Sequence, residues 1–189
     1  MSDSNGKGIL AAVRQVRTLM VEVSKLLLEA DAIMGAAGWG PRVGTTALAG
    51  GAFSINSPKN WMPHRVFRFY KHDEYPKVVL SLTVILDEQG ADQKVVEPLF
   101  SGLLMEYETV DDVPEGNSLY NTAIWHLYVP ERKDDGSTAA IVPRELWKAE
   151  STAKAMRSFA IPLASVTSRE RLEQTIVSKL LRMVENVPS

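Results

Sequence analysis

Apolar residues recur at helical spacing over residues 8–34, the longest periodic run in the chain. Every position of one helical face is apolar, which predicts a long amphipathic helix. At about 1.5 Å per residue this helix is on the order of 40 Å long, comparable to the diameter of a compact domain of this size. It therefore either spans the molecule or projects from it. The apolar positions are Ile9, Ala12, Val13, Val16, Leu19, Met20, Val23, Leu26, Leu27, Ala30, Ile33 and Met34.

Three further apolar residues of this helix, Leu10, Val21 and Leu28, lie off the main face. They are displaced from its centre by roughly 100° or more. One interpretation is that they are ordinary exposed apolar residues, which every protein surface contains. The other is that they form a second contact surface for another subunit. Spacing alone leaves both interpretations open.

A glycine-rich segment, residues 35–63, follows the predicted helix. It is either a plain crossover, with a short strand near residues 46–55, or a loop that binds a small molecule or nucleotide-like ligand. The phosphate-binding pattern Gly-x-x-x-x-Gly-Lys-Ser/Thr is absent, and the glycines follow a helix instead of leading from a strand into one. For the ligand-binding alternative, the candidate residues are Trp39, Arg42, Trp61 and, from the next segment, Arg68.

Alternating patterns then predict strands. Over residues 65–71, Phe67 and Phe69 point to one face, and Val66, Arg68 and Tyr70 point to the other. Residues 78–86 predict a strand more clearly, with one continuous apolar face and one mixed face. Further strands are predicted at residues 99–110, 119–129 and 158–166.

The chain ends in a second amphipathic helix, predicted over residues 168–186, with Thr167 and Glu170 as a capping box. Residues 141–156 give no clear pattern. Consecutive strands joined by short turns usually pair antiparallel. We therefore predict one α+β domain over residues 1–189, with a mainly antiparallel sheet of about five strands at residues 64–166, packed by the long N-terminal helix and the C-terminal helix.

Composition excludes several kinds of chemistry. The chain has no cysteine, which rules out disulfides, thiolate metal sites and cysteine nucleophiles. Its net charge is −2, whereas a general nucleic-acid binder is usually basic. Arg14 and Arg17 interrupt the first apolar run, so we read no secretory signal, and no window is apolar enough to span a membrane. We expect a cytoplasmic protein without a membrane partner.

Candidate catalytic residues are few. His64 and His126 are weak candidates for acid-base chemistry, and the histidines lack the spacing of a metal site. Asp111, Asp112 and Glu115 precede Gly116 but do not have calcium-loop spacing, so we interpret them as a turn. We predict neither a metal nor a cofactor.

Charge is uneven along the chain. Residues 87–115 carry nine acids against one base, whereas residues 59–71 interleave bases with aromatic side chains. The latter combination is also used to bind single-stranded nucleic acid. On a strand, however, the aromatic residues face the core and the bases face water, and we favour that explanation.

These observations favour a non-catalytic adaptor, assembly or regulatory protein that acts through protein contacts, as a homo-oligomer or within a complex. The alternative is a ligand-binding domain or enzyme with a site between residues 35–63 and the sheet. Binding of single-stranded nucleic acid through residues 59–71 is a third alternative, which we do not favour.

Overall fold

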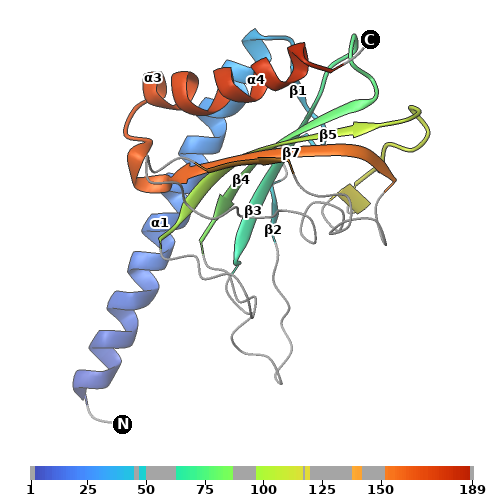
Figure 1. Ribbon diagram of the computed structural model, residues 1–189. Coiled ribbons are helices and arrows are strands. Elements are labelled where there is room, and N and C mark those ends of the chain that lie inside the picture. The colour runs from blue at the N-terminus through green and yellow to red at the C-terminus, as the bar shows by residue number, and fades with distance from the viewer. Residues whose placement is uncertain are drawn as a thin grey trace.

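The computed structural model describes residues 3–44, 47–49, 63–86, 97–116, 118–119, 138–141 and 152–187. It shows an α+β fold in which a long N-terminal helix, α1 (Asp3–Ala36), precedes an antiparallel sheet and a C-terminal helix (Figure 1). The predicted fold class is therefore confirmed. The N-terminal helix is longer than the predicted 8–34, at 34 residues.

Seven described strands form the sheet, in the order β1-β3-β4-β5-β7-β6, with β2 beside β1 on the same edge of β3. All pairs are antiparallel, and β3, β4 and β5 form a meander. The strands are β1 (Gly40–Pro41), β2 (Leu48–Ala49), β3 (Arg65–Lys71), β4 (Val78–Ile85), β5 (Leu99–Tyr107), β6 (Thr138–Ile141) and β7 (Ala153–Pro162).

The strand predictions differ in how well they hold. Those for β3 and β4 agree with the structure to within one residue, and β2 lies inside the short strand expected near residues 46–55. The predicted strand at residues 158–166 is β7, which begins at Ala153 and gives way to a 3-10 turn at Leu163–Ser165. Leu119 is helical, so the strand predicted at 119–129 does not begin there, and its other residues lie outside the described part of the chain.

The sheet is buried on both faces. Val66 and Tyr70 of β3 belong to the core that packs under the helices, together with alternate residues of β4. Phe67 and Phe69 belong to a second core on the opposite face. This second core also contains Val113 and Leu119 from the segment after β5, Ile85, Leu103, Met105, Tyr107 and Met156.

The C-terminal helix packs on the same face of the sheet as α1 (Figure 1). It consists of α3 (Arg169–Leu172), a π-helical turn η4 (Glu173–Val177) and α4 (Ser178–Glu185). Its N-cap is Ser168, whose hydroxyl oxygen accepts the backbone N–H of Arg171. The predicted capping box of Thr167 and Glu170 is therefore wrong by one residue, and Glu170 instead accepts a hydrogen bond from Gln174.

Gly38 ends α1. Its φ of 84° is left-handed, the backbone N–H of Trp39 reaches the carbonyl of Met34, and that of Gly38 reaches the carbonyl of Gly35. This pattern is a Schellman motif, in which glycine avoids the steric cost of a Cβ. A Cβ at Gly38 would also lie 2.5 Å from Nε2 of His72. The glycine cluster thus supplies the predicted helix stop.

Replacing Gly38 by Ala should therefore lower the free energy of unfolding by about 1–2 kcal/mol, because of the left-handed backbone and the contact with His72. Gly35→Ala is the matched control. Gly35 is helical and a Cβ there would meet nothing within 4 Å, so this change should raise stability by about 0.5–1 kcal/mol. Urea denaturation of the two variants measures both effects, and a shift of the same sign for both would contradict the assignment.

Candidate functional site

The N-terminal half of α1 extends beyond the sheet (Figure 1). Every side chain from Gly6 to Thr18 is exposed, Leu19 and Met20 are half-buried, and Val23 is the first buried residue of the helix. We call residues 6–18 the free half of α1. The helix thus both packs on the molecule and projects from it, because it is longer than the surface it covers.

One apolar stripe runs along the whole helix. Its members alternate in steps of four and three residues, which is the heptad spacing of helices that pack side by side. From Val23 onward the stripe packs on the protein's own sheet. Before that point it lies on the surface, where Ile9 is 54% exposed and Val13 46% exposed. The stripe comprises Ile9, Val13, Val16, Met20, Val23, Leu27, Ala30 and Met34.

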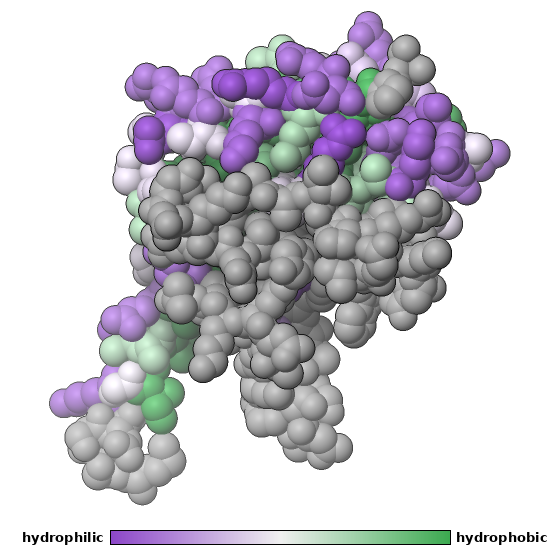
Figure 2. All heavy atoms as spheres, viewed as in Figure 1, coloured by the Kyte–Doolittle hydropathy of each residue, from purple (hydrophilic) through white to green (hydrophobic). Residues whose placement is uncertain are grey.

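The three apolar residues off the main face are all exposed, Leu10 to 49%, Val21 to 52% and Leu28 to 64%. They do not belong to the internal core. They lie about 90–110° around the axis from the free part of the stripe, on the same side as Arg17. Figure 2 shows hydrophobic and hydrophilic surface side by side on the protruding helix. The exposure of these three residues is what the predicted second contact surface requires, and that surface remains a prediction.

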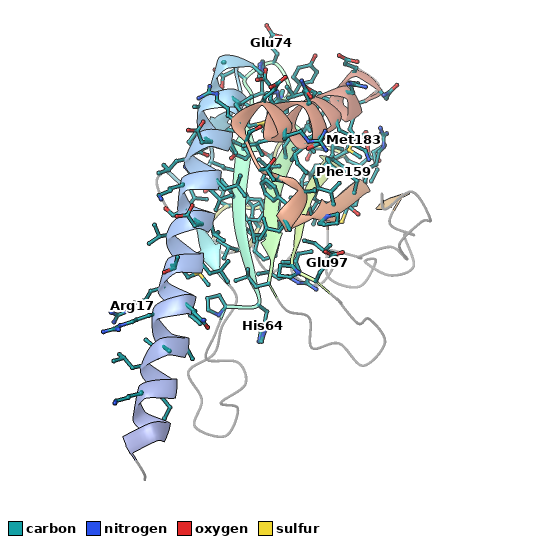
Figure 3. The ribbon with its side chains drawn as sticks, turned by 90° about the vertical axis from the view of Figure 1, so that its left-hand side faces the viewer. Arg17, His64, Glu74, Glu97, Phe159 and Met183 are labelled. Carbon is teal, nitrogen blue, oxygen red and sulfur yellow. The ribbon has the colours of Figure 1, made fainter. Side chains whose placement is uncertain are left out.

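The charges of α1 are sorted along its length. After Asp3, which begins the helix, residues 4–21 contain Lys7, Arg14 and Arg17 and no acid, whereas the second half contains Glu22, Glu29 and Asp31 with Lys25. At about 100° per residue, the three cations fall within about 80° of one another around the axis. Arg17 lies about 70° from the exposed part of the stripe, whereas Arg14 and Lys7 lie about 130–150° from it, on the far side of the helix. Figure 3 shows Arg17 pointing away from the sheet. The free half is therefore a basic amphipathic helix.

A cavity of about 160 Å³ lies where the exposed stripe meets the body of the protein. One wall is α1, and the other is formed by Ala47, Val66 and Arg68 beside the β2–β3 edge. The α1 residues that line it are Met20, Val23, Ser24, Leu27, Leu28 and Asp31.

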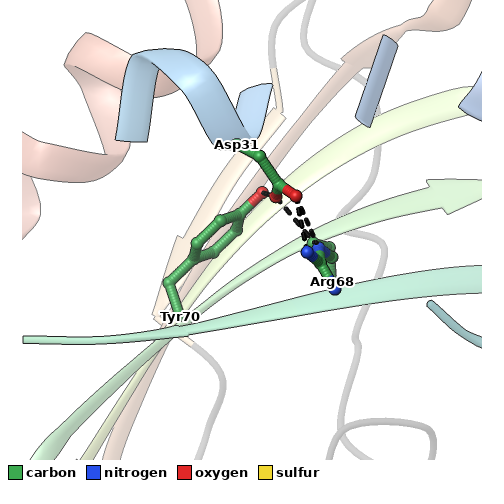
Figure 4. A network of polar contacts seen from close by, with 3 residues as sticks. All are labelled: Asp31, Arg68 and Tyr70. Carbon is green, nitrogen blue, oxygen red and sulfur yellow. Dashed lines mark hydrogen bonds and ion pairs between the residues drawn. The ribbon is translucent and has the colours of Figure 1, made fainter. Parts of the chain in front are cut away.

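The floor of this cavity is polar. Nε of Arg68 donates to both carboxylate oxygens of Asp31, at 2.9 and 3.1 Å, and Nη2 also donates to Oδ2 (Figure 4). The hydroxyl of Tyr70 donates to Oδ1 at 2.9 Å. Arg68 is only 5% exposed, and hydrogen bonding to Asp31 raises its pKa. The three residues tie α1 to β3, since a buried guanidinium needs a charged partner.

The residues proposed for a ligand site do not converge. Trp39 is buried at the end of α1, stacked on Tyr75 and next to His72. Arg42 donates to the carbonyl of Pro114, which belongs to the segment that covers the other face of the sheet.

His64 directly precedes β3, at the opposite end of that strand from β1 (Figure 3). The strand has seven residues and spans about 23 Å. Trp61 and His126 lie outside the described residues. Of the described candidates, Arg68 lines the cavity beside α1, whereas Trp39, Arg42 and His64 do not.

The segment considered for nucleic acid is largely internal. Arg65, Phe67, Phe69 and Tyr70 are all buried, so these side chains cannot stack on bases or reach phosphates. Residues 59–62 lie outside the described part. The aromatic residues of this segment thus face the core, as the favoured explanation expected. Its other expectation, that the bases face water, is wrong for Arg65 and Arg68, because both are buried in the sheet.

The acidic segment forms local contacts. A carboxylate oxygen of Asp112 accepts both the backbone N–H and the hydroxyl of Thr109, as expected of a turn. Glu106 is buried and pairs with Lys154 at 3.3 Å. Within the part of the chain that the structure describes, no group of three or more acids or histidines could hold a metal ion. Nor is any helix there long and apolar enough to cross a membrane.

No known protein family, curated protein or solved structure matches this chain.

Sequence reasoning missed Asp31 and the cavity. A signal was present, since Arg68 and Tyr70 were predicted on one strand face with Val66, which is the face that packs against a helix. An arginine on such a face requires an acid opposite, and Asp31 sits among the apolar residues Ala30 and Ile33.

Asp31→Ala should lower the free energy of unfolding by roughly 2–4 kcal/mol, because it leaves the buried Arg68 guanidinium without its carboxylate. Glu29→Ala is the matched control on the same helix. Glu29 pairs with Arg169 at 2.9 Å on the exposed surface, and its loss should cost less than about 1 kcal/mol. Equal losses in chemical denaturation would show that the Asp31 contact does not anchor α1.

Burial raises the pKa of Tyr70 and of Tyr107, and the neighbouring Asp31 carboxylate raises that of Tyr70 further. Unfolded tyrosine ionises near pH 10 while these folded phenols stay protonated. The stability that each buried phenol contributes is therefore fully present below about pH 10. Above that pH, the free energy of unfolding falls by about 1.4 kcal/mol per pH unit for each group. Tyr107→Phe, which among the described residues removes a hydroxyl contact to the Met105 sulfur, should flatten this fall in denaturation curves at pH 9–11. An unchanged slope would refute the assignment.

Proposed function

We propose that this protein is a non-catalytic adaptor or assembly factor that binds another protein through the free half of α1 and the apolar residues next to it. The observation that carries the proposal is the exposed continuation of the buried apolar stripe. The same helix face that holds α1 on the sheet is unpaired over its first half, within the described structure.

The energetics support a contact at this place. A helix of this length is marginally stable by itself in water, so its free half gains from being packed. Covering the exposed portions of Ile9, Leu10, Val13 and Val16 would contribute roughly 4 kcal/mol, about a thousandfold in affinity before the costs of association. Contacts of Val21 and Leu28 would add to this value.

The ligand-binding and enzyme alternative is not favoured by any described feature. Its candidate residues are dispersed, and Arg68 is already paired with Asp31. Arg68 lines the cavity beside α1, which is continuous with the proposed contact surface.

The test compares Ile9→Glu plus Val13→Glu with the control Gln15→Glu, which places the same kind of charge on the opposite side of the helix. In an extract of the cells that make the protein, the native chain and the control should elute in size exclusion as a complex with a partner. The double variant should elute as the isolated chain with an unchanged melting temperature. A complex that survives the double substitution would place the contact elsewhere, and an isolated native chain would refute the proposal.

A further inference from the structure

We draw no further inference here: the strongest candidate, the exposed apolar stripe on the free half of α1 together with the cavity at its base, carries none because nothing in the structure shows what covers it.

Discussion

The packing of the second half of α1 on the sheet is the contact on which the other features depend. Val23, Leu27, Ala30 and Met34 join the core under the helices, and from there the helix continues into solvent. An isolated helix of the same sequence would be marginal in water. The docked half therefore both nucleates the free half and fixes the direction in which it projects.

The ion pair of Asp31 with Arg68 fixes the position of α1 along the sheet. Apolar contacts alone are tolerant of small shifts, because one apolar side chain can replace another of similar size. A buried guanidinium is less tolerant of such shifts, since it loses a charged partner when the carboxylate moves away. The pair thus sets where the free half begins, and it forms the floor of the cavity that continues the exposed stripe.

Division of the helix into two halves also changes the meaning of its charge. Over the full length of α1 the polar face is mixed in sign, which argues against any charged partner. Once the second half is seen to be docked, the exposed part has Lys7, Arg14 and Arg17 without an acid. A local surface can therefore be strongly basic in a chain of net charge −2.

The sequence by itself determined the elements and their faces, because side-chain periods of 3.6 and 2 residues follow directly from backbone geometry. It placed Phe67 and Phe69 opposite Val66 and Tyr70, and both end helices against the sheet. Only the tertiary structure decided how far α1 is covered, since burial depends on what lies beside a residue and not on its period. Val13 and Val23 are equivalent in the sequence pattern, yet one is exposed and the other is core.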